Sequence, residues 1–269
     1  MFFTLHTFFW LIILYLFNRT PLKFVNFIYL IFSRFEYSHF QHFHFMVKKI
    51  LSILGLVWMS AFSSHAQTIQ DIFNSGYPVT WLGIDYSHSK IVGKMSQFGG
   101  KTPVSAAEIH DTYYAEWNQL ILDEPEKYDV AKMISRKTVV KDISMVTQLN
   151  ATSSMDSVEV VSTPSYIPEQ IQKFVSSYPL ENKSGIGMIF ITESMHKSYG
   201  GAYYHVVFFK MDTKEILLQQ RVQGLVQGAG IRNYWATTYF DVIEYMRNDQ
   251  MPRWKKRYGS STVTPEPKW

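Results

Sequence analysis

Histidines are the first residues of this sequence that could carry chemistry, as metal ligands or as catalytic bases. Beyond residue 66 there are four of them, at His88, His110, His196 and His205. No two have the spacing by which a helix brings two ligands onto one zinc ion, and the chain has neither an H-E-x-x-H motif nor a cysteine. We therefore predict no metal site and no cofactor.

Nucleophilic catalysis would need a serine presented to a base. The sequence has no G-x-S-x-G elbow, which places a serine on a strained turn between strand and helix. Asp85, Ser87 and His88 are close together, but neighbours on a strand point to opposite faces. We expect Ser87 and His88 to point apart, and we assign no catalytic residue.

Carboxylates flanking a sugar bond would indicate a glycosidase. Glu193 ends an apolar strand pattern and is a candidate for burial, as is His205 within the next such pattern. Asp212 and Glu215 surround a predicted turn, where solvated acids are common. A hydrolase acting on glycan or peptide therefore remains the alternative function, with Glu193 or His205 in its cleft.

A glycine-rich segment precedes a predicted helix and forms the candidate ligand site, which consists of Gly228, Gly230, Arg232 and Asn233. Free N–H groups at a helix start favour an anion, and an arginine adds a fork of donors. The spacing matches neither a P-loop nor a dinucleotide motif. A tight turn at the sheet edge explains the same glycines without a ligand.

Positive charge gathers near the carboxyl end of the chain, with an aromatic residue among the cations. This predicted interaction patch consists of Arg253, Trp254, Lys255, Lys256 and Arg257. It could contact anionic lipid, polysaccharide or a protein. The alternative is a solvated helix end, where the helix dipole favours cations.

Residues 46–66 have the features of a secretory signal peptide. Lys48 and Lys49 precede an apolar run that is too short to span a membrane, and small residues precede a predicted cut after Ala66. Residues 1–45 hold 12 of the 20 phenylalanines and are interpreted as a wrongly assigned upstream extension, with a membrane hairpin as the rival reading. We expect one domain over residues 67–259 and a loose tail over residues 260–269.

Charge and cysteine content set the expected compartment. The first 66 residues contain five of the 26 basic residues and one of the 22 acidic residues, which leaves 21 of each sign. The mature chain is therefore balanced, and we predict no nucleic-acid partner. Without cysteine there is neither a disulfide nor a thiol for a lipid anchor. We expect a periplasmic or secreted protein with no integral membrane span in its mature form.

Hydrophobic periodicity predicts an α/β domain. It has a mixed sheet of about five or six strands, an antiparallel C-terminal hairpin and about three or four flanking helices. Strands are predicted at 77–93, 138–149, 157–163, 185–197, 202–211 and 216–224. Helices are predicted at 102–122, 125–134, 167–178 and 232–247. In the last strand Gln219, Arg221 and Gln223 share one side, so that side is predicted to be half exposed.

Three segments carry a resemblance to known proteins: "SGIGMIFITESMHK", "VVFFKMDTKEILLQQRVQG" and "GAGIRNYW", followed by "WKKRY". They resemble the C-terminal signature of a family of uncharacterised exported proteins of Bacteroidota-type bacteria, over about half of the mature chain. The strand–turn–strand part is also similar to periplasmic α/β domains of the curli secretion channel and of activators of penicillin-binding proteins, whose lipid-anchoring cysteine is missing here. The resemblance implies export and one α/β domain, and it carries no activity. We therefore expect a non-enzymatic domain that binds an envelope protein or glycan.

Overall fold

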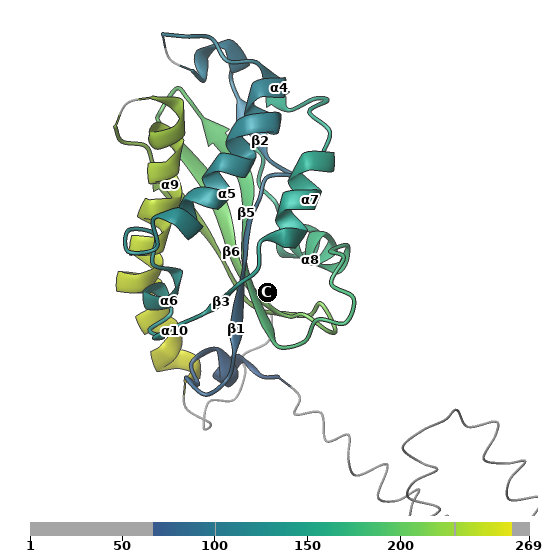
Figure 1. The fold of residues 1–269 in the computed structure, drawn as a ribbon, viewed down its shortest axis with the longest axis vertical. Coiled ribbons are helices and arrows are strands. Elements are labelled where there is room, and N and C mark those ends of the chain that lie inside the picture. The colour runs from purple at the N-terminus through teal and green to yellow at the C-terminus, as the bar shows by residue number, and fades with distance from the viewer. Residues whose placement is uncertain (1–66, 100, 229, 260–269) are drawn as a thin grey trace, which may run out of the picture. The chain divides into compact units, whose positions relative to one another are not determined.

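A mixed sheet of seven strands forms the centre of the computed structural model (Figure 1). β5 is the longest strand and lies in the middle. The strands are β1 (Val79–Asp85), β2 (Lys90–Val92), β3 (Val140–Lys141), β4 (Glu159–Val160), β5 (Ile186–His196), β6 (Gly201–Lys210) and β7 (Ile216–Leu225).

The structure describes residues 67–99, 101–228 and 230–259, which belong to one compact unit. The upstream extension, the signal peptide and the C-terminal tail predicted above lie outside the described residues. Among the residues that are described, no helix is both long enough and apolar enough to cross a membrane.

The two edges of β5 pair in opposite senses. One edge runs parallel to β1 along residues 186–191 and then parallel to β2 along residues 194–196. β3 and β4 extend this side, also in parallel, whereas β6 pairs antiparallel with the other edge and β7 antiparallel with β6. The predicted α/β class is confirmed. The predicted antiparallel hairpin corresponds to β6 and β7, although helices follow it.

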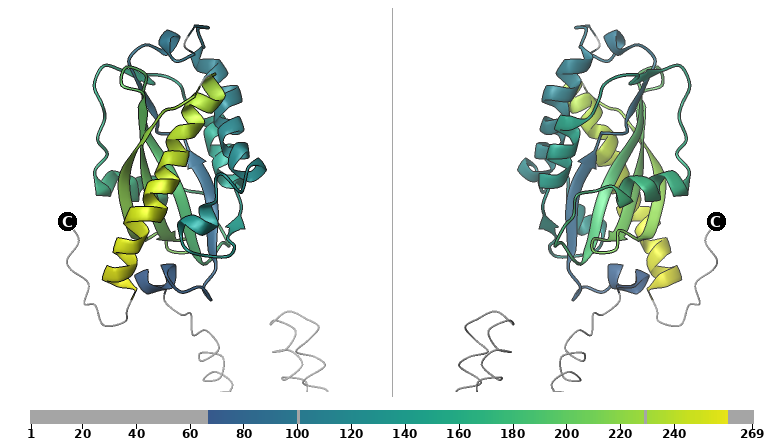
Figure 2. Two further views of the ribbon diagram at one scale, coloured as in Figure 1. Left: turned by 90° about the vertical axis from the view of Figure 1, so that its left-hand side faces the viewer. Right: turned by 90° about the vertical axis from the view of Figure 1, so that its right-hand side faces the viewer.

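Helices cover both faces of the sheet (Figure 2). We call the side that packs against α5, α9 and α10 the α9 face, and the side that packs against α7 and α8 the α8 face. The helices are α4 (Ala106–Glu108), α5 (Tyr114–Asp123), α6 (Val130–Met133), α7 (Ser144–Thr152), α8 (Pro168–Ser176), α9 (Ile231–Tyr245) and α10 (Met251–Tyr258). Two π-helical turns, η3 (Ile109–Tyr113) and η4 (Met246–Gln250), and two 3-10 turns, η1 (Ile69–Ile72) and η2 (Met95–Gln97), complete the set.

Large aromatic side chains fill the α9 face. Trp81 of β1 meets Phe190 of β5 edge to face, with ring centres 4.9 Å apart, and Phe98 stacks on Trp235 of α9 at 4.3 Å. All four are almost completely buried. Such aromatic pairs stabilise the folded state by more than the burial of their apolar area alone would. This face therefore supplies the main hydrophobic core.

The α8 face is apolar over only part of its length. The core there includes Leu82, Met145, Val146, Ile171, Val175, Tyr178, Ile189, Ile191, Val207 and Phe209. Along β5 the next side chain on this face is Glu193, and on β6 the residue paired with Ile191 is His205. The apolar core of this face thus gives way to buried polar groups toward the C-terminal end of β5.

Helix predictions succeeded where capping and periodicity agreed. The Ser105 hydroxyl accepts a hydrogen bond from the Glu108 amide at 3.0 Å and starts the first predicted helix. Tyr114 is fully buried beside Trp117, and the π-helical turn η3 that precedes it adds a residue and rotates the helix face. The helices predicted at 167–178 and 232–247 correspond to α8 and α9.

Three strand predictions were right only in part. The pattern at 138–149 forms only β3 and then α7, because the Asp142 carboxylate accepts from the Ser144 amide and hydroxyl and Met145 and Val146 bury one helix face. The segment at 157–163 forms only the two-residue β4. The stretch at 77–93 forms β1 and β2 with a turn between them. The count of seven strands exceeds five or six because two of them have only two residues.

Candidate functional site

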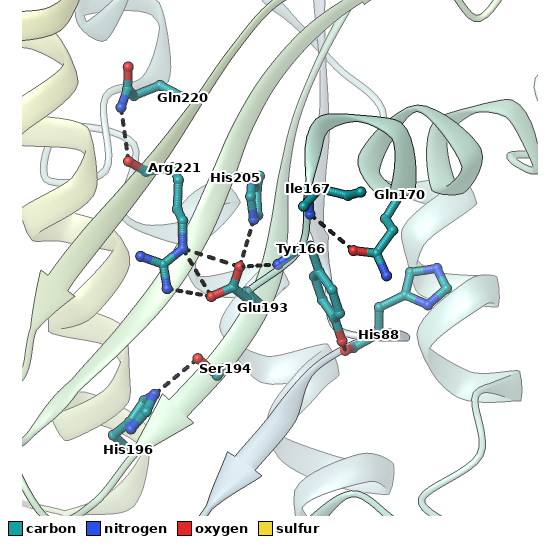
Figure 3. Close-up of polar contacts among 10 residues, drawn as sticks. All are labelled: His88, Tyr166, Ile167, Gln170, Glu193, Ser194, His196, His205, Gln220 and Arg221. Atoms are coloured by element: carbon teal, nitrogen blue, oxygen red, sulfur yellow. Dashed lines mark hydrogen bonds and ion pairs between the residues drawn. The ribbon is translucent and has the colours of Figure 1, made fainter. Parts of the chain in front are cut away.

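Glu193 lies on the α8 face, two residues beyond Ile191, at a β-bulge in β5. The register between β5 and β6 shifts between Thr192 and Ser194, so that Glu193 is an extra residue in the ladder. Bulges redirect a side chain and are frequent next to functional sites. Figure 3 shows the Glu193 carboxylate lying between His205 of β6 and Arg221 of β7.

Four donors from three chain segments converge on the Glu193 carboxylate, which is fully buried. Oε2 accepts from His205 Nε2 at 2.9 Å and from the Tyr166 amide at 3.0 Å. Oε1 accepts from Arg221 Nη2 at 2.5 Å and from its Nε at 3.0 Å. His205 must donate here, because an ionised carboxylate only accepts. The cluster therefore ties β5, β6 and β7 to the segment that precedes α8.

The protonation state of Glu193 follows from these bonds. Burial alone raises its pKa, but the hydrogen bonds from His205, Arg221 and the Tyr166 amide outweigh burial and lower the pKa to about 2. Burial lowers the pKa of Arg221, whereas pairing with Glu193 raises it above its ordinary value. Both groups are therefore charged near neutral pH, and Glu193 has no proton to give as a general acid.

Arg221 connects this buried carboxylate to the surface. Its guanidinium carbon lies 3.7 Å from the centre of the Tyr203 ring, and 34% of its side chain is exposed. Two of its nitrogens, Nε and Nη2, bond Glu193. Tyr199 lies in the turn after β5 and is exposed. Arg221 is thus held by Glu193 and by the Tyr203 ring while part of its side chain is exposed.

A buried serine–histidine pair lies beside this cluster. The distance from Ser194 Oγ to His196 Nε2 is 3.0 Å, and Figure 3 shows the pair on the same stretch of β5 as Glu193. Burial, and then the charge of Arg221, lower the pKa of His196. Such a pair is the first element of a nucleophile–base arrangement. Ser194 is 0% exposed and His196 is 1% exposed, so the hydroxyl is closed to substrate in this conformation.

The segment between β4 and α8, residues 161–167, closes one side of the cluster, and we call it the Tyr166 segment. The Tyr166 hydroxyl donates to the His88 carbonyl at 2.7 Å, in addition to the bond from its amide to Glu193. The His88 ring stacks on Phe174 of α8 with centres 3.6 Å apart, and burial lowers the pKa of His88 although Asp85 opposes this. Tyr166 is therefore held by two hydrogen bonds, one from its amide and one from its hydroxyl.

Asp85 at the end of β1 does not form a catalytic group with its neighbours. Its Oδ1 accepts from the Ser87 hydroxyl at 2.6 Å, and its Oδ2 accepts from the Tyr178 hydroxyl at 2.7 Å. His88 stacks on Phe174 and does not bond Ser87. Ser87 and His88 lie in the turn between β1 and β2, rather than on the strand predicted at 77–93, and their side chains have different partners.

The candidate ligand set lies at the start of α9. Gly228 and Gly230 have φ angles of 87° and 79°, which L side chains rarely adopt, so the glycines serve the turn. Arg232 Nη1 lies 3.2 Å from Asn233 Oδ1, and its Nη2 lies 3.9 Å from Glu124 Oε1. The guanidinium therefore faces an acid and an amide. This set belongs to the helix layer of the α9 face, whereas Glu193 lies on the α8 face.

The predicted cationic patch lies on α10. Arg253 pairs with Asp249 at 2.8 Å, and Arg257 lies 5.3 Å from the centre of the Tyr258 ring. Lys255 and Lys256 are exposed. Trp254 is buried against Phe208 of β6 at 6.1 Å, so its ring belongs to the core rather than to the surface.

Over residues 67–99, 101–228 and 230–259, no three histidine, aspartate or glutamate side chains gather as a set of metal ligands. Comparison of the chain with protein-family models, with curated proteins and with solved structures gave no match.

Sequence reasoning singled out Glu193 and His205 but missed their partners. Arg221 was recognised only as part of the polar side of a strand, and that alternation was the available signal. Tyr166 left none, because it acts through its main-chain amide. The pairing of Ser194 with His196 was also missed, although their spacing of two residues on a strand places them on one face.

Proposed function

We propose that this protein is an exported, non-enzymatic α/β domain that binds a partner in the cell envelope, either a protein or a glycan. One observation carries the non-enzymatic part. The most deeply buried carboxylate of the candidate site, Glu193, has a pKa of about 2 and accepts from three residues at once. A carboxylate in this state organises its neighbours and does not transfer protons.

The group that Glu193 organises supports a binding role. Arg221 is fixed by two hydrogen bonds and by the Tyr203 ring, so little of its conformational freedom remains to be lost when it binds a ligand. Arginine and tyrosine are enriched in the energetically dominant parts of protein interfaces. The rigid Arg221 and the exposed Tyr199 thus provide a recognition surface beside the buried cluster.

The export part of the proposal rests on the sequence. A cationic start, a short apolar run and small residues before Gln67 support cleavage and release, and the charge balance beyond residue 66 fits a protein without a nucleic-acid partner. Mass-spectrometric sequencing of the natural amino terminus tests this part. The expected first residue is Gln67, and a mature protein that begins before residue 46 would contradict it.

The alternative is an envelope hydrolase acting on glycan or peptide, and the hydrogen bond between Ser194 and His196 is the observation that favours it. It would require the pair, 0% and 1% exposed, to open to substrate. The geometry of the described residues shows both groups covered.

One experiment separates the two functions. Purified protein is incubated with isolated peptidoglycan sacculi and with envelope protein extracts, and both saturable co-sedimentation and the release of soluble fragments are measured. We expect saturable co-sedimentation without release, and we expect Ser194→Ala to bind as the parent protein does. Release of glycan or peptide fragments that Ser194→Ala abolishes would establish the hydrolase instead.

A further inference from the structure

The outer edge of β7 is an open sheet edge. β7 has ten residues and pairs only with β6, and no other strand in the described part of the chain reaches it. The strands on the opposite side, β3 and β4, have two residues each. A long edge exposes main-chain donors and acceptors that another extended chain can pair with. β7 therefore offers the only long edge within the described ranges.

The register of the β6–β7 ladder identifies which groups point outward. The Val226 amide donates to the Gly200 carbonyl at 2.9 Å, so residue 226 faces β6. In an antiparallel pair, successive residues alternate between facing the partner and facing away. It follows that Gln219, Arg221 and Gln223 direct their main-chain N–H and C=O groups away from β6.

Side chains hydrogen-bond to the main chain at both ends of this edge but leave most of its middle unbonded. The Ile216 amide donates to Gln172 Oε1 at 3.1 Å, and the Leu225 amide donates to Asp241 Oδ2 at 3.0 Å. Between these two points, the described residues bond only one outward group, the Arg221 carbonyl, which accepts from Gln220 Nε2 at 3.0 Å. The amides of residues 219, 221 and 223 have no partner among the described residues.

We propose that residues 219–223 of β7 accept an extended segment of the envelope partner as an added β-strand, with an acidic side chain of that segment beside Arg221. The proposal rests on the binding function proposed above and names the surface and the chemistry. In this mode of recognition, main-chain hydrogen bonds supply affinity and side chains on one face supply specificity.

Charge complementarity selects this occupant. Arg221 is a cation, and 34% of its side chain is exposed on the face that an added strand would extend. A carboxylate there would form a charge-assisted hydrogen bond. Antiparallel pairing of two copies centred on this stretch would instead place Arg221 opposite Arg221, and like charges directly opposite each other destabilise a sheet. An acidic partner segment therefore fits better than a second copy of the chain.

Amide hydrogen exchange and peptide titration test the proposal directly. The probes are two soluble ten-residue peptides of alternating threonine and valine, one with a central aspartate and one with a central lysine. In the free protein, the amides of residues 219, 221 and 223 should exchange much faster than those of residues 218, 220 and 222. Binding of the aspartate peptide should slow the first set, and the lysine peptide should bind at least about tenfold more weakly, which corresponds to about 1.4 kcal/mol.

Variants at Gln223 supply the matched control, because this residue is exposed and its amide points outward. Gln223→Pro removes the outward N–H and leaves the ladder to β6 intact, whereas Gln223→Ala keeps that N–H. We expect the proline variant to lose peptide binding and the alanine variant to keep it. Gln223→Glu alters no main-chain group, so it still tests peptide binding at the β7 edge if the proline variant unfolds. We expect this variant to bind the aspartate peptide more weakly, because the two carboxylates repel each other.

The outcomes separate this proposal from the binding function on which it rests. Equal binding of the two peptides, equal binding by the proline and alanine variants, or slowed exchange elsewhere on the protein would overturn the β7 site. If Gln223→Pro still co-sedimented with envelope material like the parent protein, the binding function would stand and the β7 site would fail. Absence of both peptide binding and co-sedimentation would overturn both.

Discussion

The two faces of the sheet bury polar groups in different ways. On the α9 face the Tyr204 hydroxyl lies 2.6 Å from Thr238 Oγ1, and both residues are neutral and fully buried. On the α8 face the buried group is the ionised Glu193, held by His205 and by the partly exposed Arg221. Burying a charge requires a partner and several hydrogen bonds, whereas a hydroxyl requires one bond. The neutral pair is therefore part of the hydrophobic core, whereas the charged cluster fixes the position of Arg221, a side chain that reaches the surface.

The largest effect that would sharpen this comparison is expected from Glu193→Gln. The variant leaves Arg221 without its counter-charge, and we expect the free energy of unfolding to fall by about 2–3 kcal/mol, less than for a fully buried pair because a third of Arg221 is exposed. Urea unfolding measures the change. Amide exchange should accelerate at Tyr166 and His205 and stay unchanged in α9.

Asp249→Asn is the matched control for that variant, because it removes the 2.8 Å pair between Asp249 and the exposed Arg253. We expect a loss of no more than about 0.5 kcal/mol, as for other exposed helix pairs. Equal losses for the two variants would show that the Glu193 cluster is no more than a surface ion pair.

A smaller effect is expected on the α9 face from Thr238→Val, which keeps the side-chain shape and removes the hydroxyl that Tyr204 contacts. Leaving a buried hydroxyl without this partner should lower the free energy of unfolding by about 1–2 kcal/mol. Tyr239→Phe is the control, because the Tyr239 hydroxyl is buried with no partner among the described residues. We expect its stability to be unchanged or higher. A large loss in Tyr239→Phe would reveal a polar network on this face.

The pH dependence of stability tests the same cluster, and it arises on the α8 face. The pKa of Glu193 is about 2 in the folded protein and about 4.3 when unfolded, so its stabilisation is complete above about pH 4.3 and is lost as pH falls through about 2. Burial lowers the pKa of His196 and of His88 below about 6.5, so both favour the folded state above that pH and lose this contribution below it.

Thermal unfolding between pH 7 and pH 2 should therefore show two declines. His196→Asn should reduce the upper decline without removing it, because His88 remains. Glu193→Gln should reduce the lower decline. We assign the decline that remains to Asp142, because hydrogen bonds from Lys183 and Ser144 lower the pKa of this carboxyl group to about 2. If Glu193→Gln left the lower decline unaltered, the carboxylate would not be held by its partners in solution.

Elements with strong local signals were predictable. Ser105 caps the helix that precedes α5, and Pro168 begins α8, because both preferences act within one turn. The strand predicted at 138–149 failed because the burial of Met145 and Val146 against the α8 face, rather than β propensity, decides that segment. The π-helical turn before Tyr114 left no signal in the sequence, since it depends on how the helix packs.

The candidate site was predictable only in part, for a related reason. Glu193 and His205 were noticed because polar residues interrupt apolar strands. Their meeting depends on the bulge at residue 193 and on the pairing of β6 with both neighbours, which brings together residues 12 and 28 positions away from Glu193. Residues paired across strands carry no mark of their partner in the local sequence.

The sequence by itself determined the absence of cysteine, the balance of charge beyond residue 66, the α/β class and most helix positions, because composition and short-range periodicity contain that information. Only the tertiary structure decided that four donor atoms bond the Glu193 carboxylate, that Arg221 is held while part of its side chain is exposed, and that the middle of β7 is open. These properties depend on strand register, which is set by side chains that are distant along the chain and meet only when the sheet forms.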